Sequence, residues 1–83
     1  MKKIILDGTM LGSCESAHPY LKEKLGFPEY YGNNLDALYD CLTEMSDTKI
    51  IICLADQITP YFRRVLRVFN RAVSEGCINI ELQ

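Results

Sequence analysis

Residues 49–54 have the sequence KIIICL, which is apolar after its first position and rich in β-branched side chains. Such side chains favour strands, and an uninterrupted apolar run is typical of a strand in a parallel sheet. The sequence therefore predicts a strand over residues 49–54 that is buried on both faces.

Two further strands are expected on either side of this run. Residues 3–6 (KIIL) are a second short apolar run, which Asp7 and Gly8 close in a turn. Residues 78–82 (INIEL) alternate apolar and polar side chains, which indicates a strand nearer the edge of a sheet.

Helix signals fill the segments between these strands. Ser13 or Ser16 provides an N-cap for a first helix, with Pro19 near its first turn and Gly26 at its end. Asn34 caps a second helix, which we expect to run from Leu35 to about Met45. Thr59 caps a third helix, which opens with Pro60 and ends before Gly76.

Strands that alternate with helices predict an α/β architecture, a three-stranded parallel sheet packed with three or four helices. The chain has 83 residues, of which 48% are apolar, and only five are Gly and three Pro. That composition is typical of a packed globule, and a chain of this length supports one hydrophobic core. We expect a single domain over residues 1–83.

The apolar runs and the cysteines bear on compartment and chemistry. The run after Lys3 is too short for a secretion signal, and no run approaches the ~20 apolar residues of a membrane span. The four cysteines include no C-x-x-C pair, and Cys14 and His18, four residues apart, lack a third group for a nucleophilic or metal site. We expect a cytoplasmic protein without membrane, metal or cofactor.

Charge is uneven along the chain, although the net charge is only −2. Residues 25–48 contain five acids and no Lys or Arg, whereas residues 57–75 contain four arginines and one acid. This polarity bears on the choice of partner more than on the fold.

The second helix separates apolar from polar side chains. Its core-facing set is Leu35, Leu38, Leu42 and Met45. Its opposite face carries Asp36, Tyr39, Asp40 and Thr43. Carboxylates four residues apart repel in a helix, so a lysine at either place would serve stability better. With Tyr30 and Tyr31 of the preceding loop, these residues form a patch that suits a basic partner, although a solvated helix face has the same composition.

Residues 25–43, LGFPEYYGNNLDALYDCLT, resemble the signature of the barstar family. The similarity continues in residues 68–72 and 75–77, while the stretch between Leu54 and the last long helix is shorter than in barstar. The resemblance implies an inhibitor and not an enzyme. The family lays this helix and loop across the active-site groove of a secreted microbial ribonuclease of the barnase type, and no nucleic acid binding is expected.

The resemblance also implies roles for individual residues. The Asp40 carboxylate would take the place of the RNA phosphate, since arginine recognises the two groups in much the same way. Asp36 would engage neighbouring donors, Tyr30 would pack on the catalytic histidine, and Gly32 would allow a close backbone approach. The expected partner-binding set is Tyr30, Gly32, Asn34, Asp36, Tyr39, Asp40 and Thr43, with Asn34 mainly setting the helix start.

Two positions depart from the family pattern. Tyr39 stands where barstar carries a tryptophan, and Arg71 stands where the best-known member has a glutamate that helps to hold the ribonuclease. Arg63, Arg67 and Arg71 form a stripe at i, i+4 and i+8. Such a stripe is typical of a solvated helix face, and it also fits an acidic group on a divergent target.

Three functions stay open at this point. The first is a ribonuclease inhibitor that is monomeric when free. The second is a barstar-like binding or immunity module for a basic partner that is not a ribonuclease, which Arg71 motivates. The third is a small enzyme that uses Asp36, Asp40 and Glu44 as a carboxylate or metal cluster, although helical neighbours that point outward rarely converge on a site.

Overall fold

The computed structural model describes residues 2–53 and 58–83 of the chain. Its strands are β1 (Lys2–Asp7), β2 (Thr48–Cys53) and β3 (Ile78–Leu82). Its α-helices are α1 (Cys14–Leu25), α2 (Leu35–Thr43) and α3 (Pro60–Ser74), and a 3-10 turn, η1 (Gly8–Leu11), follows β1. None of the helices in these residues combines the length and apolarity needed to cross a bilayer.

β2 is the central strand of a parallel sheet, with β1 on one side and β3 on the other. Ile50 of β2 lies opposite Ile4 of β1 and Ile80 of β3. The three-stranded parallel sheet and the edge position of the last strand are therefore confirmed. The predicted last residue of the central strand, Leu54, and the start of the shortened segment after it lie outside the described residues.

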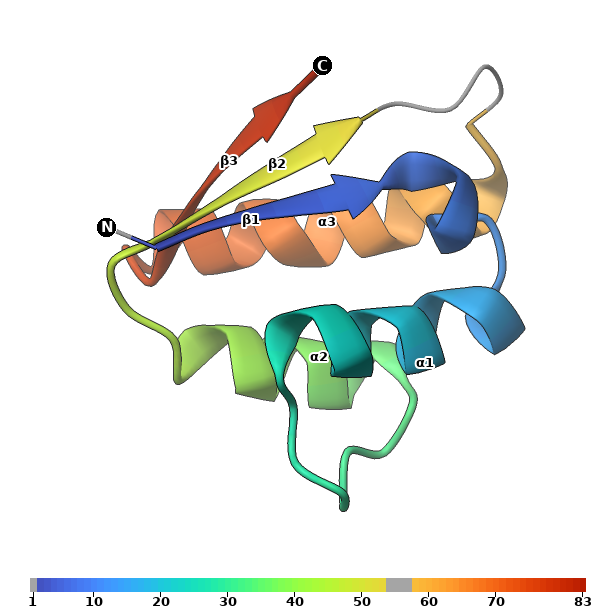
Figure 1. Ribbon diagram of the computed structural model, residues 1–83, viewed down its shortest axis with the longest axis horizontal. Helices are drawn as coiled ribbons and strands as arrows, with labels where there is room; N and C mark the ends of the chain where they lie inside the picture. The colour runs from blue at the N-terminus through green and yellow to red at the C-terminus, as the bar shows by residue number, and fades with distance from the viewer. Residues whose placement is uncertain (1, 54–57) are drawn as a thin grey trace.

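The expectation that β2 is buried on both faces is wrong. Ile50 and Ile52 are fully buried, whereas Ile51 is only half-buried. Ile5, which pairs with Ile51 across the sheet, is 64% exposed. The reason is the one-sided arrangement in Figure 1, where α1, α2 and α3 all lie on the same side of the sheet. A run of isoleucines has no alternation and so cannot reveal that one face is open.

Helix α1 begins at Cys14, too early for Pro19 to lie in its first turn. Ser13 is the N-cap and its hydroxyl accepts a hydrogen bond from the N–H of Ser16. Pro19 consequently lies inside the second turn, where it removes one helical hydrogen bond, and the prediction for this residue is wrong. Gly26, with a φ of 69°, ends the helix as predicted.

Helix α3 lies between the sheet and α2, and contacts both. Phe62 and Phe69 of α3 are fully buried, as are Leu38 and Leu42 of α2. The apolar face of α2 packs against α3 and the core, so its opposite face points to solvent. The helix ends at Thr43, two residues before the predicted end.

Gly8, at the junction of β1 and η1, is a close-packed position that tests this architecture. A Cβ added there would overlap the carbonyl oxygen of Cys53 and lie 3.0 Å from Cε2 of Phe62. We expect Gly8→Ala to lower the free energy of unfolding in urea by about 1–3 kcal/mol, the usual cost of overpacking.

Gly12→Ala is the matched control, because its Cβ would have its nearest neighbour at 3.6 Å and its backbone is already right-handed helical. It should change the free energy of unfolding by less than about 0.5 kcal/mol. Equal losses in the two variants would contradict the packing at Gly8.

Candidate functional site

Asn34 fixes the start of α2 and ties the preceding loop to it. Its Oδ1 accepts a hydrogen bond from the N–H of Ala37 at 2.7 Å, and its Nδ2 donates to the carbonyl of Gly32 at 3.2 Å. A Cβ on Gly32 would lie only 3.1 Å from that Nδ2. The predicted cap is confirmed, and Gly32 lets the loop stay close to the helix.

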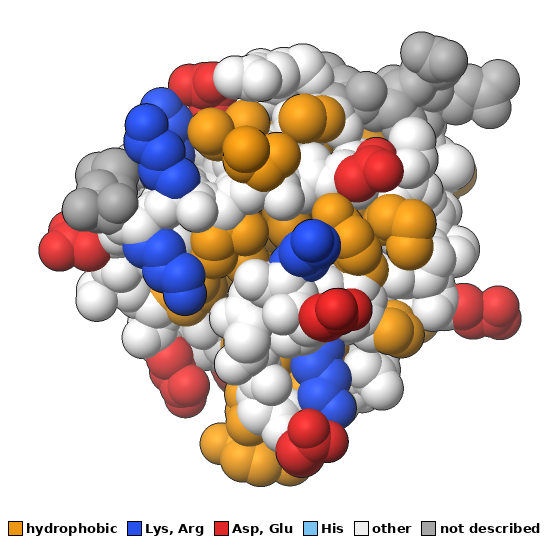
Figure 2. All heavy atoms as spheres, in the orientation of Figure 1, with side chains coloured by type: hydrophobic (Ala, Val, Ile, Leu, Met, Phe, Trp, Pro, Cys, Tyr) orange, Lys and Arg blue, Asp and Glu red, His pale blue; other side chains and the backbone are white. Residues whose placement is uncertain are grey.

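Asp36 and Asp40 lie exposed on the solvent face of α2. Within residues 2–53 and 58–83, neither carboxylate forms an ion pair or accepts a side-chain hydrogen bond. Figure 2 shows acidic, basic and hydrophobic side chains interleaved over one face of the molecule. Asp36 and Asp40 keep their full acceptor capacity for a partner.

A shallow cleft of about 340 Å³ lies between the loop and α2. Its lining consists of Pro28, Tyr30, Tyr31, Gly32, Ala37, Asp40, Cys41 and Glu44. The structure therefore brings Tyr30, Gly32 and Asp40 of the predicted set together. Tyr30 is 87% exposed, so its ring has most of its area still to bury on a partner.

Sequence reasoning did not assign Ala37, Cys41 and Glu44 to this cleft. Their signal is helical spacing, because positions 37, 40, 41 and 44 are related as i, i+3, i+4 and i+7 and so share one face with Asp40. Burial, and then the carboxylates of Glu44 and Asp40, raise the pKa of the Cys41 thiol. The thiol stays protonated at neutral pH and serves as a half-buried apolar group.

Asp36 and Tyr39 of the predicted set lie on a second cleft, of about 380 Å³, between α2 and α3. Its lining consists of Leu35, Asp36, Tyr39, Arg64, Arg67, Val68 and Arg71. The guanidinium carbon of Arg71 lies 4.5 Å from the ring centroid of Tyr39, a cation–π contact. Thr43 lines neither cleft, and its hydroxyl donates to the carbonyl of Asp40 at 2.8 Å.

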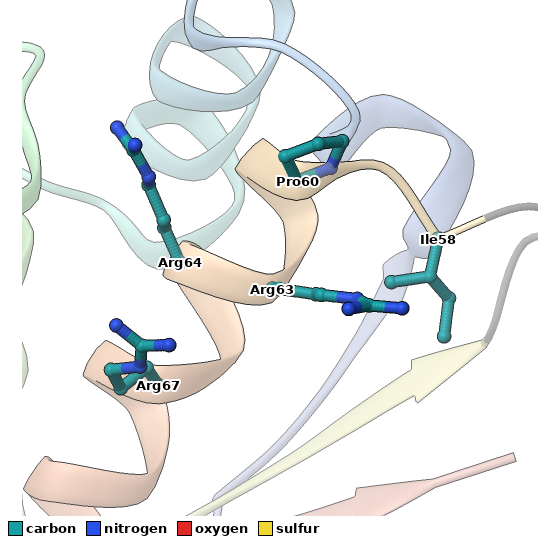
Figure 3. A pocket seen from close by; sticks show the side chains of 5 residues that line it. All are labelled: Ile58, Pro60, Arg63, Arg64 and Arg67. Carbon is teal, nitrogen blue, oxygen red and sulfur yellow. The ribbon is translucent and has the colours of Figure 1, made fainter.

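The arginines of α3 are shared between this cleft and an adjoining pocket. Figure 3 shows that pocket, which Arg63, Arg64 and Arg67 line together with Ile58 and Pro60, and in which Arg63 extends toward Ile58. The arginines that share the cleft with α2 are Arg64, Arg67 and Arg71. Arg64 was missed, and its signal is the i, i+3, i+7 spacing of these three residues.

Tyr31 does not join Tyr30 in an exposed patch, because its side chain is buried. Its hydroxyl lies 2.6 Å from Nδ1 of His18, which is fully buried, and Nε2 of His18 lies 2.5 Å from the hydroxyl of Tyr61. A neutral imidazole donates from one nitrogen and accepts at the other, so it matches two hydroxyls. This network connects α1, the loop and α3.

The same network bears on the Cys14 and His18 pair considered from the sequence. Both ring nitrogens of His18 already have hydrogen-bond partners, so neither is available to activate the Cys14 thiol or to bind a metal ion. Among the residues described, no three His, Cys, Asp or Glu side chains converge as a metal ion would require. Burial lowers the pKa of His18 from its ordinary value of 6.5 and raises the pKa of Tyr61 to about 12. The imidazole of His18 and the hydroxyls of Tyr31 and Tyr61 are therefore all neutral at pH 7.

Comparison with known proteins places this site in a family context. A family model described as "Barstar (barnase inhibitor)" matches residues 1–76, which include both clefts. A protein of Bacillus subtilis (strain 168), named "Putative ribonuclease inhibitor YrdF", is 52% identical over 54 residues. That match covers 65% of this chain and 59% of the relative, less than two thirds of its length.

The lowered pKa of His18 predicts that stability depends on pH. Because the unfolded chain binds this proton more readily, the stability due to neutral His18 is fully present above about pH 6.5 and is lost as the pH falls through the lower folded-state pKa. We expect the free energy of unfolding in urea to decrease from about pH 7 to pH 5, by at most about 1.4 kcal/mol per pH unit from this group.

The His18→Gln variant provides the comparison, because glutamine retains a donor and an acceptor but does not titrate in this range. Its unfolding free energy should depend less steeply on pH than that of the wild type. Parallel pH profiles for the two proteins would show that His18 is not the group responsible.

Proposed function

The chain belongs to the barstar family, and from this premise we propose that it inhibits a secreted microbial ribonuclease of the barnase type by occupying its active site. The family description and the name of the B. subtilis relative both denote inhibitors, in agreement with the prediction that the chain is not an enzyme. The observation that carries the proposal is the exposed Asp40 carboxylate, without an internal partner in the described chain, beside the exposed Tyr30 ring.

Asp40 is suited to act as a phosphate mimic. A ribonuclease active site presents cationic donors where the RNA phosphate binds, and a carboxylate accepts the same paired hydrogen bonds from arginine. Asp36, one turn earlier on the same solvent face, adds a second negative charge for neighbouring donors. Tyr30 lines the cleft with Asp40 and supplies an aromatic ring to cover the groove.

The hydrogen bonds that hold the loop before α2 in place favour tight inhibition. Asn34 joins the loop to α2, and His18 holds Tyr31, the neighbour of Tyr30, against α1 and α3. A loop held in this way loses little conformational entropy when it binds. In this proposal the inhibitor is a monomer when free, and it protects the cytoplasm of the cell that produces the ribonuclease.

A second candidate function rests on α3. Three arginines line the cleft beside Asp36, and a target that is basic throughout would meet them with like charge. This observation favours a barstar-like binding or immunity module for a different partner, should no ribonuclease be inhibited.

The test is titration of the protein into an RNA-cleavage assay with a ribonuclease of the barnase type and a panel of its relatives. We expect inhibition of at least one enzyme at a near-equimolar ratio. Asp40→Ala should weaken that inhibition by more than about 2 kcal/mol, about 30-fold in Kd, the magnitude known for interface hot spots, those of barnase with barstar among them.

Glu23→Ala is the matched control, since it removes one exposed carboxylate from α1, outside both clefts. It should inhibit as well as the wild type. Failure of the wild type against every enzyme would refute the inhibitor function, whereas full inhibition by Asp40→Ala would refute only the phosphate mimicry.

A further inference from the structure

Arg64, Arg67 and Arg71 are three exposed cations on one side of α3. The ion pairs in the described part of the chain are Lys22 with Glu29 and Lys49 with Glu81, so none of these arginines is paired there. Like charges three and four residues apart destabilise a helix by a few tenths of a kcal/mol. An acid at position 67, three residues after Arg64 and four before Arg71, would therefore serve the stability of the free protein better.

The cleft around these arginines is preformed. Leu35 and Val68 contribute apolar side chains to its lining, and Val68 is 7% exposed. The ring of Tyr39 lies under the guanidinium of Arg71 at 4.5 Å and so restricts where that guanidinium can lie. A group that binds here meets cationic donors already arranged beside an apolar surface, which lowers the entropic cost of binding.

We propose that this arginine cleft, formed by Arg64, Arg67 and Arg71, receives a carboxylate side chain of a protein partner. The inference rests on the proposed function in one respect: the partner is the same protein that meets Asp40. That partner is then basic opposite Asp40 and acidic opposite Arg71. Guanidinium groups bind carboxylates through paired, charge-assisted hydrogen bonds, which supplies the recognition.

The surroundings of the cleft favour a protein carboxylate over RNA. Asp36 lines the cleft itself, and Asp40 follows on the next turn of the same helix. A nucleic acid strand brings a charge at every phosphate and would have to pass these carboxylates. A single side chain places only one negative charge near Asp36, and the three arginines of the cleft outweigh that repulsion.

The arginine cleft would also act in specificity. A ribonuclease that is basic over the whole contact surface would place cations against Arg71 and its neighbours, and such like-charge contacts reject a wrong partner. A ribonuclease with an acid at that point would gain an interaction. The two sides of α2 thus select for a partner that carries both signs of charge in a defined arrangement.

The first test needs no ribonuclease. Isotope-labelled full-length protein is titrated with tetraglutamate peptide and, separately, with an oligouridylate of matched charge, while the arginine Nε–H signals are followed by NMR. We expect the peptide to shift the signals of Arg64, Arg67 and Arg71. Arg63 serves as the internal control, because it lines the adjoining pocket and not the arginine cleft. Arg71→Glu should weaken peptide binding about tenfold, and the charge-matched Arg63→Glu less than about twofold.

Three results would overturn the proposal: no shift with the peptide, equal shifts for Arg63 and the cleft arginines, or tighter binding of the oligouridylate. A second measurement applies to any ribonuclease that the chain inhibits, where Arg71→Glu should weaken inhibition more than Arg63→Glu does. A gain in inhibition by Arg71→Glu would also overturn it. If no ribonuclease is inhibited, the proposed function fails, and the peptide titration still decides the arginine cleft.

Discussion

One-sided burial of the sheet is the constraint on which the rest of this structure depends. All the described helices lie on one face of a three-stranded sheet, so α3 is enclosed between the sheet and α2. Helix α3 must therefore be apolar toward two neighbours and retains only a narrow polar strip, where its arginines lie. Helix α2 is the outer layer and needs apolar residues on one side only. Its other side is free to be acidic, which is why the candidate site forms there and borders the arginines of α3.

A buried polar network fixes the loop against this scaffold. His18 is fully buried, yet both its nitrogens have hydroxyl partners, so the core accommodates a polar ring without an unsatisfied group. Anchoring Tyr31 inward leaves its neighbour Tyr30 outward. A loop in a different position would leave His18 without one partner, and the cost of that loss favours the single arrangement in which Tyr30 lines the cleft.

Local chemistry was sufficient to predict much of the fold, and distant contacts explain what it missed. Asn34 and Thr59 were recognised as caps because a cap bonds to backbone only three residues ahead. The inward turn of Tyr31 depends on His18, 13 residues away, which in turn bonds to Tyr61, 43 residues farther along the chain. The grouping of the arginines likewise depends on which strip of α3 lies beside α2. Propensity and spacing carry no information about either.

The coexistence of free acids and free arginines on one surface follows from the small value of surface ion pairs. Asp36 lines the same cleft as the arginines and still forms no ion pair with them. An exposed pair would contribute only about 0–1 kcal/mol to the free protein, so little stability is lost by leaving the charges apart. Against a partner that excludes water, the same charges interact in a lower dielectric and gain strength. With a net charge of only −2, long-range steering is weak, and discrimination between partners must come from these local contacts.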